Sequence, residues 1–334
     1  MKKSDITALM QKMRLGWNLG NTFDAPPGET AWHNPVTTPE MIQKIHSIGF
    51  ETLRLPISWH RHVDENYSVD PAFMDRINEV VDYAYNDGMY VIINIHHDDH
   101  MYRPARETLE GGKRYICRIW EQAAERFKDY GERLIFETMN EPRLLRHECE
   151  WHLNLKDPVS LEAAECINEY NQAALESIRK ISPDRLVMVP PYCAAPKHAW
   201  IPQFKAPEDP SDRLIISVHS YDPIQLCLMP NPEETVFDRR AEETVEHIMV
   251  NLEERFVKNG LPVIIGEIGM WDKGNPNDRY RWSKFFTECA KRHGMIGVWW
   301  DNGGREFRLL NRRECEIYPE CETVVRGLLE GSAV

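Results

Sequence analysis

The sequence predicts a single (β/α)8 barrel, and three observations support this fold class. Eight short apolar runs lie along the 334 residues, and each is typical of a strand buried on both faces. Helical patterns with recognisable first and last residues separate these runs. No Gly/Ser linker or low-complexity segment divides the chain, so we expect one catalytic domain over 1–334, with a short lead-in at 1–13 and a C-terminal helix at about 320–330.

The expected strands are rich in Val, Ile, Leu and Met, and they show little alternation of polar and apolar residues. Continuous apolar runs of this kind are typical of parallel strands that are covered on both sides. The strands are expected at 14–19, 52–57, 90–96, 134–140, 186–190, 214–219, 262–267 and 295–300.

The segments between the strands carry the signals of amphipathic helices. Thr38-Pro39 and Asp70-Pro71 are suited to helix starts, and Gly49 is suited to a helix end. Apolar residues recur at helical spacing after these starts, and the pattern returns within 116–131, 175–183, 245–260 and 282–294. The Pro-rich segments 190–210 and 223–232 are expected to be long loops. An open doubly wound sheet is the main alternative, but no Gly-x-Gly-x-x-Gly motif or phosphate-binding loop supports it.

Polar and aromatic residues gather where the expected strands end. In a barrel these ends face one mouth, where the following loops converge. Two of the runs lead to glutamates, Glu141 and Glu267, and burying a carboxylate is costly unless it is paired or has a function. The remaining strand ends contribute Asn18, Asn21, Arg54, His96, Asn140, Tyr192, His219, Tyr221, Trp299 and Trp300.

Two carboxylates accompanied by hydrogen-bond donors and an indole fit glycoside hydrolysis. One carboxyl group must hold a proton for the leaving oxygen while the other is ionised, so their pKa values must differ. Arg54 is placed to keep one carboxylate charged, and an apolar wall behind the other would raise its pKa. Neighbouring residues of a strand point to opposite faces, so we expect Trp300 at the mouth and Trp299 against the helices.

Each of these residues also has a structural interpretation. Glu141 could be an acidic residue at a helix start, and Glu267 could be a simple ion-pair partner. Arg54, His96 and His219 could be barrel residues with satisfied hydrogen bonds and no role in chemistry.

The segment from His96 to His100, His-His-Asp-Asp-His, resembles a metal cluster. Adjacent residues of a strand diverge, so at most alternate members should converge on one ion. We therefore expect His96 alone in the mouth and no catalytic metal. A metal-dependent barrel hydrolase built on this segment is the alternative.

The composition limits the classes of partner. The formal net charge is −13 and the pI is near 5.5, which argues against nucleic acid and anionic membranes and suits a neutral substrate. No apolar run approaches the roughly 18 residues of a membrane span. The basic start is not followed by the apolar core of a signal peptide, so we expect none in this chain.

The eight cysteines show no Cys-x-x-Cys pair, and most fall in expected helices or beside apolar residues. We therefore expect reduced, packed thiols. Cys315 and Cys321 are the only close pair and could form a disulfide.

Several motifs resemble those of glycoside hydrolase family 5, the large cellulase family. The resemblance runs from about Met13 to Gly304, and the motifs keep the family's order. A loop from Glu29 to Pro35 is similar to that of its subfamily 4 endoglucanases, except that His33 stands where glycine is usual. The motifs are Gly16-Trp17-Asn18-Leu19-Gly20-Asn21, Arg54-Leu55-Pro56, Asn140-Glu141-Pro142, His219-Ser220-Tyr221-Asp222-Pro223, Gly266-Glu267 and Trp299-Trp300-Asp301-Asn302-Gly303.

The resemblance implies a barrel enzyme that hydrolyses internal β-1,4-glucosidic bonds with retention of configuration. Glu141 would be the general acid and then base, and Glu267 the nucleophile. Arg54 and Tyr221 would orient Glu267, His219 would support Glu141, and Asn140 would address the sugar 2-hydroxyl group. His96 and Asn21 would bind sugar, and Trp300 would form the platform beside the scissile bond. Trp32 and Trp271 are candidate platforms for more distant sugars. No metal or organic cofactor is implied.

The implied partner is a β-glucan polysaccharide or oligosaccharide, and no protein, nucleic acid or membrane partner is implied. An endo-β-1,4-mannanase or xyloglucanase is a near alternative, and a non-catalytic glycan-binding barrel is a distant one. A polymeric substrate favours an extracellular enzyme whose signal was removed, whereas the missing signal alone favours the cytoplasm.

Overall fold

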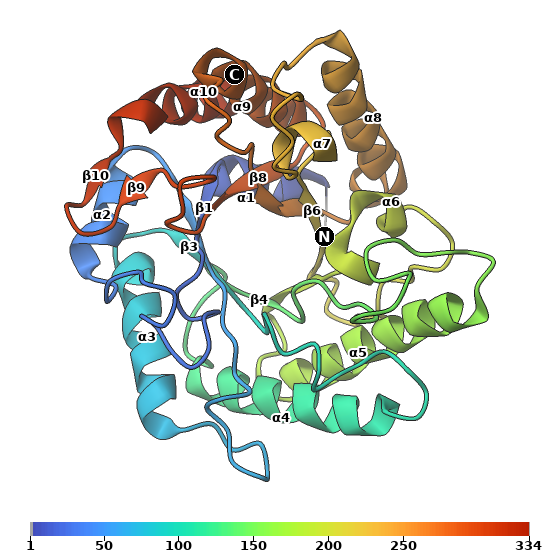
Figure 1. The fold of residues 1–334 in the computed structure, drawn as a ribbon. Helices are drawn as coiled ribbons and strands as arrows, with labels where there is room; N and C mark the ends of the chain where they lie inside the picture. Colours follow the sequence, from blue (N-terminus) through green and yellow to red (C-terminus); the bar gives the residue numbers. More distant parts are fainter. Residues whose placement is uncertain (1–2, 334) are drawn as a thin grey trace.

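The computed structural model describes residues 3–333, which form a closed barrel of eight parallel strands inside a ring of helices (Figure 1). The strands pair in chain order, and the eighth returns to the first. The predicted (β/α)8 fold is confirmed, and the doubly wound alternative is excluded because a closed barrel leaves no free edge. The strands are β1 (Gly16–Leu19), β2 (Thr52–Leu55), β3 (Tyr90–Asn94), β4 (Leu134–Glu137), β5 (Leu186–Val189), β6 (Leu214–Ser220), β7 (Val263–Ile268) and β8 (Ile296–Asp301).

Three strands end at least two residues earlier than the apolar runs predict. β3 stops at Asn94 and β4 at Glu137, so His96 and Glu141 lie in the first turns after the ladder. The expected strands 90–96 and 134–140 are therefore too long, as is 52–57. The backbone leaves the ladder there, although the Asn140 amide still donates to the carbonyl of Ile95 at 2.9 Å.

Three of the six large barrel helices begin at a capping aspartate. Asp70, Asp157 and Asp238 accept hydrogen bonds from backbone amides of the first turns that follow them. Gly49 and Gly88 follow the first two of these six helices and have φ values of 111° and 101°, which glycine adopts without strain. These helices are α2 (Pro39–Ser47), α3 (Pro71–Asn86), α4 (Leu109–Arg126), α5 (Pro158–Ile181), α8 (Arg239–Arg255) and α9 (Pro276–Arg292).

The Pro-rich segments are more regular than the expected long loops. They contain the short helices α6 (Pro196–Ala199) and α7 (Ile224–Cys227) and the 3-10 turn η1 (Tyr192–Ala194). The remaining elements are α1 (Lys3–Met13), η2 (Val257–Asn259), β9 (Leu310–Asn311), β10 (Glu316–Ile317), η3 (Pro319–Cys321) and α10 (Glu322–Ala333).

Two apolar cores hold the barrel together. The larger core lies between the strands and the helix ring. The smaller one fills the inside of the barrel, where Ile92, Ile135 and Ile264 meet Met10 and Met13 of α1. Helix α1 thus closes the amino-terminal end of the barrel, and the opposite end is left for polar residues.

All eight cysteines are free thiols, so the suggested Cys315–Cys321 bridge does not form in this structure. The Cys321 thiol instead donates to the carbonyl of Arg308. Among residues 3–333, no helix combines the length and the apolar character that crossing a bilayer requires.

Two adjacent glycines of α4 provide a matched test of helix packing. A Cβ atom on Gly112 would lie 2.5 Å from the hydroxyl oxygen of the buried Tyr170, whereas one on Gly111 would meet nothing within 4 Å. We expect Gly112→Ala to lower the free energy of unfolding by about 1–3 kcal/mol through this overlap. Gly111→Ala should raise it by up to about 1 kcal/mol, because alanine favours the helix. Urea unfolding of both variants measures the difference, and equal midpoints would contradict this packing.

Candidate active site

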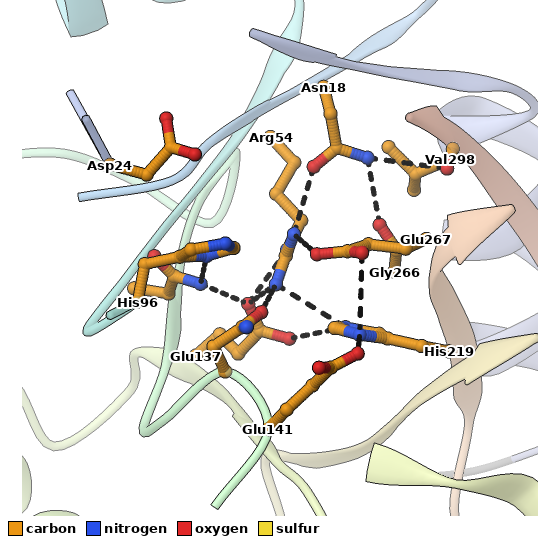
Figure 2. A network of polar contacts seen from close by, with 12 residues as sticks. Asn18, Asp24, Arg54, His96, Glu137, Glu141, His219, Gly266, Glu267 and Val298 are labelled. Atoms are coloured by element: carbon orange, nitrogen blue, oxygen red, sulfur yellow. Dashed lines mark hydrogen bonds and ion pairs between the residues drawn. The ribbon is translucent and has the colours of Figure 1, made fainter. Parts of the chain in front are cut away.

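Arg54 is the centre of a polar network at the carboxyl ends of the strands (Figure 2). It comes from β2 and is fully buried. Its Nε atom donates to Glu137 Oε2 at 2.8 Å and its Nη1 atom to Glu267 Oε1 at 2.8 Å. The amide oxygens of Asn18 and Asn140 accept from Nη1 and Nη2 at 2.9 and 2.7 Å. A planar fork of this kind fixes several acceptors in one geometry.

Glu267 stands on β7 with both carboxylate oxygens occupied. Arg54 bonds Oε1, and the Tyr221 hydroxyl donates to Oε2 at 2.8 Å. His219 Nδ1 lies 3.7 Å from Oε2. A cation and a phenol therefore hold this carboxylate at a fixed angle.

Glu141 lies across the mouth from Glu267, in the turn that follows β4. His219 Nδ1 lies 2.8 Å from Glu141 Oε1, and Arg143 Nη1 lies 3.9 Å from Oε2. One oxygen of Glu141 and one of Glu267 lie within 4.8 Å of each other. This close approach fits the carboxyl spacing of about 5–5.5 Å in retaining enzymes better than the roughly 6.5–9.5 Å of inverting ones.

The expectation of an apolar wall that raises the pKa of Glu141 is wrong. Burial alone would raise this pKa, but the hydrogen bond and the charge of His219 lower it, with a smaller contribution from Arg143. Burial alone would likewise lower the pKa of His219, but the charge of Glu267 and contacts with Glu137 and Glu141 raise it to about 9, against the repulsion of Arg54. The two groups therefore share one proton, which the pair holds at neutral pH.

The raised pKa of His219 has a consequence for stability at alkaline pH. Its stabilising effect is complete below the unfolded value of about 6.5 and disappears as pH rises through about 9, a change of about 3 kcal/mol. We expect the difference in unfolding free energy between the wild type and His219→Gln to narrow over this interval. Urea unfolding between pH 6 and 10 measures it, with the exposed His247→Gln as control. A difference that stays constant with pH would contradict this account.

Glu137 is a buried carboxylate that the sequence analysis left without a role. It accepts from Arg54, from Asn94 Nδ2 at 3.1 Å and from the Ser217 hydroxyl. Burial alone would raise its pKa, but Arg54 and then His219 and Ser217 lower it to about 2. A charged residue inside an otherwise apolar strand was the signal for this second partner of Arg54.

Arg143 is a second residue that the sequence analysis missed. Its Nη1 atom donates to the Glu141 carbonyl at 2.7 Å and lies 3.3 Å from Asp99 Oδ1. Its guanidinium stacks over the exposed ring of Trp151 at 4.2 Å. Its position two residues after Glu141 was the only sequence signal.

The aromatic residues at the strand ends form two groups. The rings of His96 and Trp300 are parallel, with centroids 5.7 Å apart. Trp299 is fully buried and contacts Trp282 of α9, so the two tryptophans point as the strand alternation predicts. Trp32 is 41% exposed, and its ring lies 5.9 Å from that of His97, the neighbour of His96.

Trp271 and Asn21 are less closely tied to the network. The Trp271 ring contacts Phe307, which in turn contacts Tyr221. Asn21 has a φ of 54°, and its backbone amide donates to the buried Asp24 carboxylate at 3.0 Å. His33 also takes a positive φ, 72°, the region that glycine adopts most easily and that its place in the loop motif requires.

The segment from His96 to His100 does not form one cluster. The Asp98 carboxylate accepts from the Trp59 amide and the Tyr115 hydroxyl, and Asp99 faces Arg143. The expectation that adjacent residues diverge is wrong for His96 and His97, because β3 ends at Asn94 before either of them. Their ligand atoms and one of Asp24 lie within 4.8 Å of one another, as do those of Glu141, His219 and Glu267. Metal-ligand spacing therefore exists at two places in the mouth.

Comparison with known proteins shows which family this barrel is similar to. Residues 18–306 match the model of the cellulase family, glycosyl hydrolase family 5. Endoglucanase B of Ruminococcus albus is 39% identical over 331 residues, which cover 93% of this chain and 77% of the relative. Endoglucanase B of Clostridium cellulovorans is 36% identical over 344 residues, covering 98% and 76%.

Solved structures give the same result. A GH5 family lichenase from Caldicellulosiruptor sp. F32 has a TM-score of 0.94 at 37% identity, covering 98% of this chain and 95% of that chain. A GH5-4 broad specificity endoglucanase from Clostridium acetobutylicum has a TM-score of 0.90 at 34% identity, covering 97% and 98%. The chain belongs to glycoside hydrolase family 5, the cellulase family, whose members hydrolyse glycosidic bonds with retention of configuration.

Proposed function

We propose that this endo-acting glucan hydrolase cleaves internal β-1,4-glucosidic bonds with Glu267 as nucleophile and Glu141 as acid and base. The observation that carries the proposal is the pair of facing carboxylates within 4.8 Å that have separate partners. Arg54 and Tyr221 hold Glu267, whereas His219 holds Glu141. The two carboxylates are thus prepared for different tasks.

In the first step, a Glu267 oxygen attacks the anomeric carbon while the bond to the leaving oxygen breaks. The leaving oxygen takes the proton that His219 and Glu141 share. The negative charge of Glu267 is the main influence that raises the pKa of His219. Forming the ester removes this charge, so the proton affinity of the pair falls while the proton is being transferred.

In the second step, water attacks the anomeric carbon and the bond to Glu267 breaks. The pair has lost its proton by then, so Glu141 accepts one from the attacking water. Glu267 recovers its charge, which restores the affinity of the pair for that proton. The same electrostatic coupling therefore serves both steps.

Sugar binding is assigned to the residues around this pair. Asn140, held by Arg54 at 2.7 Å, is positioned to address the sugar 2-hydroxyl group. His96 and Trp300 provide a flat wall beside the reacting sugar, and Asn21, Trp32 and Trp271 are assigned to sugars on either side. Relatives titled lichenase and broad specificity endoglucanase, some with bound cellotriose or cellotetraose, support a β-glucan substrate.

The test of the substrate class is product analysis on carboxymethylcellulose, lichenan, xyloglucan and glucomannan. We expect a rapid fall in viscosity and release of short oligosaccharides from the β-1,4-glucans, since an endo-acting enzyme cuts inside the chain. Activity on glucomannan alone would overturn the glucanase assignment in favour of a mannanase. Binding of these polymers without any hydrolysis would overturn the catalytic assignment in favour of a glycan-binding barrel.

A further inference from the structure

A second cluster of metal-ligating side chains lies in the helix ring, away from the catalytic mouth. We call Glu246 and Glu253 of α8, Cys289 of α9 and His293 the α8–α9 cluster. Helix α9 ends at Arg292 and leads into β8, so the cluster lies toward the amino-terminal end of the barrel. The glutamates of the catalytic mouth stand at the opposite, carboxyl end of the strands.

Helical spacing brings the four side chains together. Cys289 and His293 are four residues apart and share one face at the end of α9, as neighbours at i and i+4 do. Glu246 and Glu253 are seven residues apart and share the facing side of α8. One ligand atom from each of Glu246, Cys289 and His293 lies within 4.8 Å of the others.

The hydrogen bonds resemble the surroundings of a metal-bound histidine. His293 Nε2 lies 3.0 Å from Glu246 Oε1, and His293 Nδ1 lies 2.6 Å from Glu253 Oε2. The Cys289 thiol lies 3.1 Å from Glu246 Oε2. A carboxylate on the remote ring nitrogen fixes the tautomer and increases the basicity of the ligating nitrogen, which is the usual partner arrangement behind zinc-bound histidines.

We propose that the α8–α9 cluster binds Zn²⁺ or a similar divalent transition-metal ion. Cys289 Sγ, His293 Nε2 and Glu246 Oε1 would be the ligands, water would fill the fourth position, and Glu253 would hold His293 from behind. The thiolate and the carboxylate together neutralise the two charges of the ion. Arg292 Nη2 holds Glu246 Oε2 at 2.7 Å, so Oε1, which faces His293 Nε2, would be the oxygen that binds the metal.

The ion takes the place of the proton of the Cys289 thiol, which is released to solvent, and of the hydrogen bond between His293 Nε2 and Glu246 Oε1. A thiol must lose its proton to bind a metal ion, so binding strengthens as pH rises. Side-chain exposures of 37% for Glu246 and 13% for His293 give the ion a path from solvent.

The other clusters carry less support for a metal. Two of them belong to the catalytic mouth described above. In the third, His147, Cys149 and Asp157 lie close together, but both Asp157 oxygens accept from backbone amides at the start of α5. The third cluster still offers a matched control, because it too contains a cysteine.

Titration of the reduced, chelator-treated chain with Co²⁺ tests the proposal, because Co²⁺ bound to a thiolate gives a near-ultraviolet charge-transfer band. We expect one equivalent of Co²⁺ to produce this band and Zn²⁺ to remove it by displacement. Cys289→Ser should abolish the band, and Cys149→Ser should leave it intact. Glu253→Gln keeps all three ligands and should weaken Co²⁺ binding roughly 10–100-fold.

Two results would overturn the site. One is a thiolate band that persists in Cys289→Ser, or that disappears in Cys149→Ser. The other is the absence of any thiolate band when the wild type is titrated up to pH 9. Circular dichroism shows whether Cys289→Ser folds. If it does not, the Co²⁺ affinities of Glu253→Gln and the wild type are compared instead, and equal affinities would contradict His293 as a ligand.

Discussion

Replacing Glu267 with glutamine is expected to lower the rate of β-glucan hydrolysis by about 10⁴-fold or more while the barrel stays folded. Glutamine keeps the shape of the side chain but cannot form the covalent ester, so the first step has no nucleophile. Its amide oxygen can still accept from Arg54 or Tyr221, which is why we expect the fold to survive. Initial rates on carboxymethylcellulose and circular dichroism measure the two effects.

Replacing Glu141 with glutamine should be distinguishable from the loss of Glu267. The polymer has a poor leaving group, so losing the acid should cost roughly 10²–10⁴-fold. The phenolate of an aryl β-cellobioside with an acidic phenol leaves without a proton, so Glu141→Gln should carry out the first step on this substrate at a recovered rate. The second step should then be slow, because the variant lacks the base that activates water. Added azide should then restore turnover by attacking the glycosyl-enzyme, with a β-glycosyl azide as product.

The exposed Glu65→Gln serves as the control for both changes and should retain the wild-type rate. Near-normal rates on the polymer in either active-site variant would contradict the assignment. Azide rescue of Glu267→Gln that yields the β-azide would exchange the two roles.

Replacing Arg54 with methionine is expected to destabilise the protein by about 3–5 kcal/mol and to abolish activity. The change leaves Glu137 and Glu267 buried with an unpaired charge, and an uncompensated buried charge costs more than the ion pair contributed. The pKa of Glu137, held at about 2, should rise once Arg54 is gone. The wild-type stabilisation from this group is complete above about pH 4.5 and is lost as pH falls through about 2.

Two variants make the Arg54 prediction specific. Adding Glu137→Gln to Arg54→Met removes one unpaired charge and should recover part of the lost stability but none of the activity. Arg106 forms exposed ion pairs with Glu165 and Glu169, so Arg106→Met should cost only about 0–1 kcal/mol. Urea unfolding at neutral pH compares the variants. A loss below 1 kcal/mol in Arg54→Met would show that Arg54 does not compensate the buried charges of Glu137 and Glu267.

The arrangement of the fold could be predicted because most strands are largely apolar runs and most of the large helices have an aspartate cap or a glycine at a boundary. Runs such as 262–267 match the strand within one residue. The ends of β3 and β4 could not be placed, since their last paired residues, Asn94 and Glu137, bond to each other and to Arg54 and Trp59. Such contacts join residues that are far apart in sequence.

The residues of the candidate site could be predicted from the sequence, but the effects of their charges on one another's pKa values could not. The strand ends nominated Glu141, Glu267, Arg54 and His219, and the structure brings these four together. The pKa of Glu141 could not be inferred, because it depends on the orientation of the His219 ring. No role could be assigned to Glu137 from the sequence, because its partners Arg54, Asn94 and Ser217 come from other strands.

Trapping the glycosyl-enzyme is the most direct test of the central claim that Glu267 forms the covalent bond. A 2-deoxy-2-fluoro-β-cellobioside with a dinitrophenyl leaving group loads the enzyme but slows the release of the sugar, so the intermediate accumulates. Peptide mass analysis after proteolysis should locate one added sugar on Glu267, and none should be present in Glu267→Gln. A sugar attached to Glu141 or Glu137, or release of an α-configured first product, would contradict the account.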